Sequence, residues 1–358
     1  MQPVGNAEIA LVASQPLKID ALRVGNVSPA LGSPHVLALI ATGMMANDKN
    51  YTREKEAAEI LNRVLAHEPQ HPGVSHYIIH SYDYPALANL ALPAARSYAK
   101  IAPASAHAQH MPSHIFTRLG LWQEAVRSNL DAKAAAKAFA VRNRMSAVWD
   151  EELHAMDYLA YAYLQSAQDK QAWAVLDELN KIQKIEPQTF KVAYALAAIP
   201  ARYALERRRW DEAAKLTLPE GTAGTFPYQS FRWAEAHIHF ARAIGAARSG
   251  DPASARQEVD KLAAIQKSLV EVKGGYDWAK QVEIGRQVAA AWLALAEGDA
   301  IAIAGPFAPS LAGGPSQLLR LVARANSKFS TVAEMRALRV RRGEARVDYR
   351  LFEQHEPS

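Results

Sequence analysis

Histidine is concentrated in one part of this chain. Seven of its twelve histidines lie between positions 67 and 114, mostly in the segments HPGVSHYIIHSYDYP (71–85) and HAQHMPSHIF (107–116). Neutral imidazole nitrogens bind transition-metal ions, and burying several rings without hydrogen-bond partners is costly. The five rings that recur at steps of three and four residues within each segment are His76, His80, His107, His110 and His114.

The first segment predicts a short helix over residues 73–83. Pro72 suits the first helical position, and the Tyr-Pro pair at 84–85 is the next turn signal. His71 is then placed to cap the helix. Residues three and four apart share a helix face. The residues predicted to share one face here are His76, His80 and Asp83.

The second segment predicts a helix over residues 106–118, which Pro112 begins or kinks. If this helix lies beside the first, their histidines converge and hold one transition-metal ion. Imidazole favours Zn, Cu, Fe or Ni, whereas Mg and Ca prefer oxygen ligands. The predicted ligands are His76, His80, His110 and His114, with Asp83 and His107 as additional or outer ligands.

His154 and Asp157, three residues apart in a later helix, are the candidate catalytic residues. They would support a metal ligand or act as a general base. The sequence has no Gly-x-Ser-x-Gly elbow, phosphate-binding loop or dinucleotide fingerprint, so whether the protein is an enzyme stays open. Two alternatives to a metal site also remain, namely a metal-free polar or catalytic pocket, and histidines that serve packing or capping alone.

Helical patterns dominate the rest of the chain, and strand-like alternation is nearly absent. The segments LHAMDYLAYAYLQ (153–165), VAYALAAIPARYALERRRW (192–210) and QVAAAWLALAEGD (287–299) are rich in Ala and Leu, with aromatic residues at helical spacing. We expect their tyrosines and tryptophans to pack between helices. The sequence therefore predicts an all-α protein.

A turn followed by an alanine recurs along the chain. It appears in LGLWQEAV, RRWDEAAK and SGDPASAR, with the alanines at Ala125, Ala213 and Ala255. Related turns at 169, 211, 251 and 299 are separated by 42, 40 and 48 residues. Each step fits one helical hairpin stacked on the next.

These segments resemble the tetratricopeptide repeat, in which an aromatic residue and a small alanine let two helices approach closely. AAEILNRVLAHEP (57–69) and LPAARSYAKIAP (92–103) resemble its second helices, and the resemblance covers roughly residues 50–300. With its histidine segments, the chain is similar to a histidine-rich subgroup of bacterial tetratricopeptide-like proteins. The resemblance implies a right-handed α-solenoid whose first helices line a concave wall, and it implies no activity.

Three regions are expected. Residues 1–35 read as an irregular leader, 36–304 as the tetratricopeptide-like α-solenoid, and 305–358 as a Pro/Gly-rich linker with a basic tail that adds little stability. The first residues lack a signal-peptide pattern, so we expect a soluble cytoplasmic protein, with the periplasm left open. No membrane segment is expected.

Composition narrows the function further. The 41 Lys and Arg against 36 Asp and Glu give a charge of +5 without a long basic run before the C-terminal tail, so we expect no nucleic-acid partner. The absence of cysteine excludes thiolate ligands and a cysteine nucleophile. In later helices, Arg202, Arg242 and Arg286 are candidate anion ligands, and His239 is expected to point with Arg242 into the concavity.

The preferred interpretation is a binding protein whose histidine-lined concave site holds a transition-metal ion. One alternative is a metal-dependent hydrolase or oxidoreductase that acts on a small molecule. Another is a metal-free scaffold that binds a protein or peptide in the groove. The metal, the substrate or partner and the oligomeric state are not specified by the sequence.

Overall fold

The computed structural model describes residues 50–218, 226–270 and 277–298, which are mainly helical. This confirms the all-α prediction. The predicted leader over 1–35 and the predicted tail over 305–358 lie outside the described residues. The helices fall into two units with a boundary between Met145 and Ser146, and each unit is described by itself.

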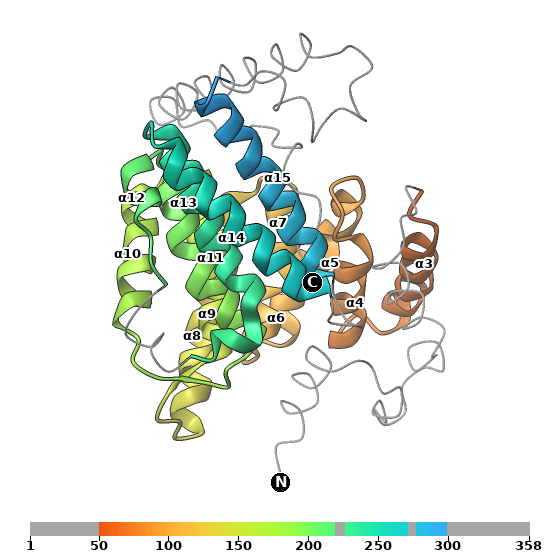
Figure 1. The fold of residues 1–358 in the computed structure, drawn as a ribbon. Coiled ribbons are helices and arrows are strands. Elements are labelled where there is room, and N and C mark those ends of the chain that lie inside the picture. Colours follow the sequence, from red (N-terminus) through yellow and green to blue (C-terminus); the bar gives the residue numbers. More distant parts are fainter. Residues whose placement is uncertain (1–49, 219–225, 271–276, 299–358) are drawn as a thin grey trace. The chain divides into compact units, whose positions relative to one another are not determined.

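The first unit consists of helices that pack largely on their neighbours in sequence (Figure 1). Helix α3 packs on α4, α4 on α5, α5 on α7, and both α6 and α7 on α8. A smaller contact joins α4 to α7. The helices are α3 (Thr52–His67), α4 (Pro72–Tyr82), α5 (Ala88–Ile101), α6 (Ala106–His110), α7 (Pro112–Arg118) and α8 (Trp122–Arg142).

Helix α4 begins and ends close to where the sequence predicts. Pro72 occupies the first turn, and the His71 side chain accepts a hydrogen bond from the Gly73 backbone N–H at 3.1 Å. The capping role predicted for His71 is therefore confirmed. The helix ends at Tyr82, so Asp83 is its C-terminal cap residue. Ile78 and Ile79 are fully buried and anchor the helix in the core.

The second histidine segment forms two short helices that meet at Met111. Ser105 caps α6 by accepting from the Ala108 N–H at 3.3 Å, and Pro112 begins α7 because its nitrogen has no hydrogen to donate. The interruption expected at Pro112 is confirmed. Ser128 of α8 donates a hydrogen bond to the carbonyl oxygen of Gln109, which fixes the end of α6 against α8.

The second unit contains a series of helices in which α9 packs on α11, α11 on α13 and α13 on α15. Helix α10 packs on α9 and α11, α12 on α11 and α13, and α14 on α13 and α15. Figure 1 shows α13, α14 and α15 side by side. Strands β1 and β2 form one short parallel pair. The elements are β1 (Val148–Trp149), α9 (Asp150–Gln165), α10 (Asp169–Lys181), β2 (Ile185–Glu186), α11 (Phe190–Glu206), α12 (Trp210–Ala214), a 3-10 turn (Tyr228–Phe231), α13 (Arg232–Arg248), α14 (Pro252–Val270) and α15 (Trp278–Ala296).

One predicted helix is shorter than expected. The helical pattern over 192–210 ends at Glu206, because Arg208 takes a backbone φ of 57°, which an α-helix does not accommodate. Trp210 instead begins α12.

Small residues allow close approach of helices. The alanines predicted from the recurring turns, Ala125, Ala213 and Ala255, are all fully buried. Gly245 lies directly against the backbone of the neighbouring helix, because a Cβ atom built on it would lie 2.4 Å from the backbone nitrogen of Ala214. Helices α12 and α13 therefore meet backbone against backbone.

Aromatic residues pack between helices as predicted. The rings of Trp233 and Trp278 stack with centroids 3.8 Å apart and planes within 5° of parallel. Tyr158 and Tyr163 of α9 are buried. None of the helices within the described ranges combines the length and apolar character needed to cross a membrane.

Candidate metal centre

Five histidine rings form a continuous row in the first unit. Ring centroids are 5.1 Å apart for His107 and His76, 4.5 Å for His76 and His80, 6.4 Å for His80 and His114, and 5.0 Å for His114 and His110. Helix α4 supplies two of these rings, α6 two and α7 one. The structure thus brings together all five histidines that the spacing selected.

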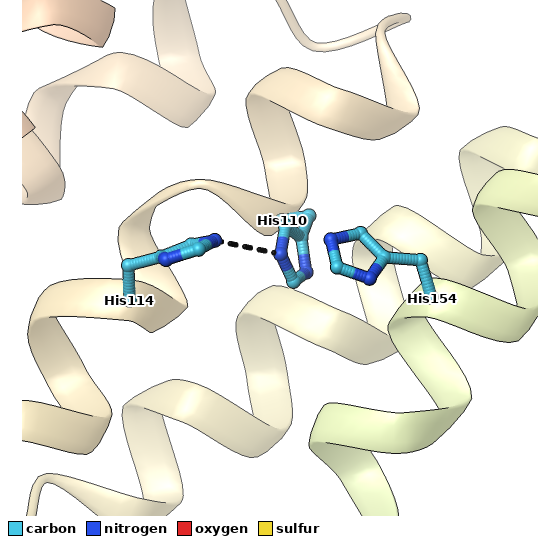
Figure 2. A group of neighbouring side chains, drawn as sticks. All are labelled: His110, His114 and His154. Carbon is cyan, nitrogen blue, oxygen red and sulfur yellow. Dashed lines mark hydrogen bonds between the residues drawn. The ribbon is translucent and has the colours of Figure 1, made fainter. Parts of the chain in front are cut away.

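His110 and His114 lie at one end of the row, and we call them the inner pair because both residues are buried. Their Nε2 atoms lie 3.1 Å apart, as the dashed line in Figure 2 marks, and the two residues are only 1% and 7% exposed. Two nitrogen ligands of a tetrahedral zinc ion, each at 2.0 to 2.1 Å, are separated by about 3.3 Å. The inner pair is therefore already spaced like two ligands of one ion.

Asn129 of α8 fixes the protonation of the His110 ring. The His110 Nδ1 atom lies 2.7 Å from Asn129 Oδ1, while the Asn129 Nδ2 group donates to the carbonyl oxygen of Ala125 at 2.9 Å. That second bond sets the amide orientation, so Oδ1 faces the ring and accepts its hydrogen. His110 therefore carries a proton on Nδ1, and in the neutral ring Nε2 presents a lone pair.

Asp83 fixes the protonation of the His114 ring in the same way. The His114 Nδ1–H group donates to Asp83 Oδ2 at 3.0 Å, and Arg118 Nε donates to Asp83 Oδ1 at 2.9 Å. Burial alone would raise the pKa of Asp83, but the hydrogen bond and charge of His114 and the charge of Arg118 outweigh it and lower that pKa to about 2. Asp83 is thus an ionised acceptor, and His114 Nε2 is left to face His110.

The contact between the two facing Nε2 atoms depends on the protonation of both rings. If both rings are neutral, two lone pairs meet at 3.1 Å with no hydrogen to share. Either an added proton or a metal cation resolves this contact. Imidazoles that bind metal commonly donate their other N–H to a carboxylate or amide oxygen, as both rings do here.

His76 and His80 form an outer pair with a different environment. Both side chains are partly exposed, but their Nδ1 atoms are buried and have no hydrogen-bond partner among the residues that the structure describes. Burial, followed by the charges of neighbouring histidines, lowers the pKa of His76 well below its usual range. Burial and His114 lower the pKa of His80 to about 4, against the effect of Asp83. Both rings are therefore neutral at pH 7.

The predicted ligands include both of these pairs, and their binding of one ion stays a prediction. Among the described residues, His110 and His114 belong to a compact group of potential metal ligands whose ligand atoms lie within 4.8 Å of one another, and His76 and His80 do not. His107 lies next to His76, while Asp83 contacts the inner pair through its hydrogen bond to His114. The role of Asp83 as an additional or outer ligand stays a prediction.

The candidate catalytic residues lie on α9 of the second unit, and Figure 2 labels one of them, His154. The His154 ring packs edge-on against Tyr158, with centroids 5.7 Å apart. Asp157 is buried and accepts a hydrogen bond from Arg202 at 2.7 Å, and Arg202 also donates to the Tyr194 hydroxyl at 2.8 Å. This carboxylate is thus part of an ion pair, and its proposed role as a general base stays a prediction.

The three arginines considered as anion ligands bind side chains of the protein itself. Arg202 pairs with Asp157, and Arg286 donates to Gln266 at 3.1 Å. Arg242 lies 3.0 Å from Glu258, and His239 lies 2.6 Å from the same carboxylate. The expectation that His239 and Arg242 point together toward a ligand is therefore revised, because both turn toward a buried glutamate of α14.

Asn129 and Arg118 were not identified from the sequence, although each left a signal. Asn129 lies on the same face of α8 as the buried alanines Ala125, Ala132 and Ala136, where an amide is out of place. Arg118 follows His114 by four residues and so shares its helix face. A polar residue on an apolar stripe near a histidine cluster is the feature to look for.

A comparison of the chain with protein-family models finds no match, and a comparison with curated proteins finds no relative. The function proposed below therefore follows from the geometry of the histidines.

Proposed function

We propose that the first unit binds a transition-metal ion between His110 Nε2 and His114 Nε2. The observation that carries the proposal is the 3.1 Å approach of two nitrogens whose rings both hold their proton on the opposite side. Neutral nitrogen ligands favour Zn, Cu, Fe or Ni, and zinc suits a tetrahedral arrangement with this spacing.

Asn129 and Asp83 support this assignment because they orient the rings before any ion arrives. Each accepts a hydrogen bond from an Nδ1–H group, so neither ring must rotate or change tautomer to bind a metal. A site that is already ordered loses less conformational entropy on binding.

A second candidate function is metal-dependent hydrolysis or oxidation of a small molecule. The inner pair supplies two nitrogens, whereas a closed structural zinc site uses four protein ligands and a catalytic site keeps a position for water or substrate. X-ray absorption spectroscopy of the zinc-loaded protein counts these ligands. Four protein ligands would favour storage or structure, and a bound water would favour catalysis.

We further propose that the metal site belongs to a tetratricopeptide-like array of hairpins with a groove for a peptide or small molecule. The buried alanines of the recurring turns support this proposal. So do the successive contacts of α9, α11, α13 and α15 within the second unit. A stoichiometric partner captured by the metal-free protein would favour a scaffold role over metal chemistry.

The test of the metal site uses protein without an affinity tag, stripped with a chelator and titrated with zinc against a chromophoric competitor. We expect tight stoichiometric binding that is lost in the His110→Ala/His114→Ala variant. The matched control is His67→Ala, which removes an exposed histidine at the end of α3. If the unmodified protein retains no Zn, Cu, Ni or Fe(II) after dialysis, the proposal is wrong.

A further inference from the structure

The outer histidines are arranged for ligation independently of the inner pair. His76 and His80 are four residues apart on α4, and their ring centroids lie 4.5 Å apart with the planes 74° from parallel. Two histidines at this helical spacing can offer one nitrogen each to the same ion. The short α4 helix, capped at His71, holds both rings on one face.

The Nδ1 atoms of His76 and His80 differ from those of the inner pair in their hydrogen bonding. In the inner pair, Asn129 and Asp83 satisfy the corresponding atoms, but the Nδ1 atoms of His76 and His80 are buried and unpaired among the described residues. A buried polar nitrogen without a partner destabilises the folded state. A neutral imidazole whose nitrogen lacks a hydrogen-bond partner can satisfy that atom by coordinating a cation through it.

Further groups around the outer pair favour a cation. The His107 ring of α6 lies 5.1 Å from the His76 ring, so a third imidazole approaches from a different helix. The negative charge of Asp83 acts on His80. On the other side, Tyr77 and Tyr98 pack edge-on against His76, at 5.0 and 6.0 Å, and confine that ring.

The inner and outer pairs do not form one compact group of ligand atoms among the described residues. His110 and His114 lie in a compact group of ligand atoms that does not include His76 or His80, and the His80 and His114 ring centroids are 6.4 Å apart. An ion held by the outer pair is therefore treated as separate from an ion held by the inner pair.

We propose that His76 and His80, with His107 from α6, hold a second transition-metal ion next to the inner site. Only nitrogen ligands are supplied, so zinc and copper are the appropriate probes. The outer ion binds more weakly, because these rings lack the orienting hydrogen bonds of the inner pair and are more exposed. This inference does not depend on the proposed inner site, since it uses different ligands.

The experiment measures metal stoichiometry by equilibrium dialysis against zinc followed by elemental analysis. We expect two ions in the unmodified protein and in the His67→Ala control. We expect one tight ion in His76→Ala/His80→Ala, and one weak ion in His110→Ala/His114→Ala. Two ions retained by the outer variant, or a single ion in the unmodified protein that only the inner variant loses, would overturn the inference.

The two proposals fail in different variants. Loss of the inner site alone would appear as a single ion that disappears in His76→Ala/His80→Ala and persists in His110→Ala/His114→Ala, and this result would support the outer site. Each variant is checked for helicity and for its unfolding midpoint by circular dichroism. A His76→Gln/His80→Gln variant repeats the test with polar side chains if the alanine variant unfolds.

Copper provides a second readout. Two Cu(II) ions on neighbouring imidazoles broaden each other's electron paramagnetic resonance spectrum through dipolar coupling. The unmodified protein loaded with excess copper should show this broadening, and either double variant should show the spectrum of an isolated ion. The spectrum of an isolated ion in the unmodified protein, lost only in His110→Ala/His114→Ala, contradicts the inference.

Discussion

The Nε2 atoms of His110 and His114 face each other at 3.1 Å, although the two residues belong to different helices. Their separation depends on the break at Met111, where α6 ends and Pro112 begins α7. The Nδ1 atom of each ring contacts a different element, because Asn129 comes from α8 and Asp83 from the end of α4. The inner pair is thus positioned by one break between helices and two hydrogen bonds, and the hydrogen bonds can be tested by substitution.

Removing the hydrogen bonds to the Nδ1 atoms of His110 and His114 should weaken metal binding without removing a ligand. We expect Asn129→Ala and Asp83→Asn each to lower zinc affinity by about 10 to 100-fold, the usual effect of losing such a partner. Competition titration against a zinc chelator measures the change. Glu124→Ala is the control, because Glu124 forms only a surface ion pair with Arg96. An unchanged affinity in both test variants would contradict the role assigned to these residues.

Zinc affinity should fall as pH drops from 7.5 to 5. Protons and metal ions compete for the same Nε2 lone pairs, so acid favours the metal-free protein. Asp83 does not contribute to this change, because its pKa of about 2 keeps it ionised throughout this range. Zinc titrations at half-unit pH intervals give the slope. An affinity that is constant over this range would indicate that imidazoles are not the ligands.

Glu258→Gln should destabilise the second unit by roughly 1 to 3 kcal/mol at pH 7, because the buried carboxylate accepts charge-assisted hydrogen bonds. Glu258 is 5% exposed and lies within 3.0 Å of His239, Arg242 and Lys261. Chemical denaturation measures the change. Glu59→Gln is the control, since its ion pair with Arg63 is fully at the surface and should contribute little.

The same carboxylate predicts a pH dependence. Burial would raise the pKa of Glu258, but hydrogen bonds from His239 and Lys261 and the charge of Arg242 lower it from 4.5 to about 2. A lowered folded-state pKa contributes stability above the unfolded value, and this contribution is lost as pH falls from 4.5 through about 2. The difference in stability between the protein and Glu258→Gln should shrink over that interval. A difference that does not change there would argue against the ion cluster.

Gly245→Ala should destabilise the protein by about 1 to 3 kcal/mol or more, because overpacking against rigid backbone cannot be relieved by a rotamer change. The added Cβ would lie 2.4 Å from the Ala214 nitrogen and 2.7 Å from the Trp210 carbonyl oxygen. Gly285→Ala is the matched control in α15, where the nearest atom is Phe240 Cδ2 at 3.7 Å. That change should be neutral or stabilising by up to about 1 kcal/mol. Equal unfolding midpoints for the two variants would show that α12 and α13 pack less closely than described.

His71→Ala should destabilise helix α4 by about 0.5 to 2 kcal/mol, the usual cost of losing an N-cap acceptor. His71→Asn should restore most of the loss, because its amide oxygen can accept from the Gly73 N–H group. Thermal unfolding of the metal-free protein measures both. If asparagine is no better than alanine, the capping bond contributes little and His71 acts in some other way.

The elements that the sequence predicted well are those that depend on local patterns. Helix periodicity, the proline at position 72 and the alanines after recurring turns act within a few residues, and the structure agrees with them. The histidine spacing likewise identified the rings that form the row. The prediction of one four-histidine ion depends on contacts between α4, α6 and α7, which spacing within one helix does not encode, and it stays a prediction.

Partners that are distant in sequence were harder to predict. Asn129 reaches His110 from 19 residues away, and Arg202 reaches Asp157 from 45 residues away. No periodic pattern within one helix encodes such pairs, because they form only when helices pack. The arginines looked like anion ligands for this reason, since their internal partners, two carboxylates and one amide, lie on other helices.

Arg118 also determines which molecules the inner site would attract. Its charge offsets that of Asp83, and Asn129 is neutral, so these three side chains add no net charge around the two imidazoles. A divalent ion bound there keeps most of its positive charge, which in buried surroundings acts strongly on nearby groups. If the inner pair binds a divalent ion, such a centre would favour negatively charged molecules over cationic ones.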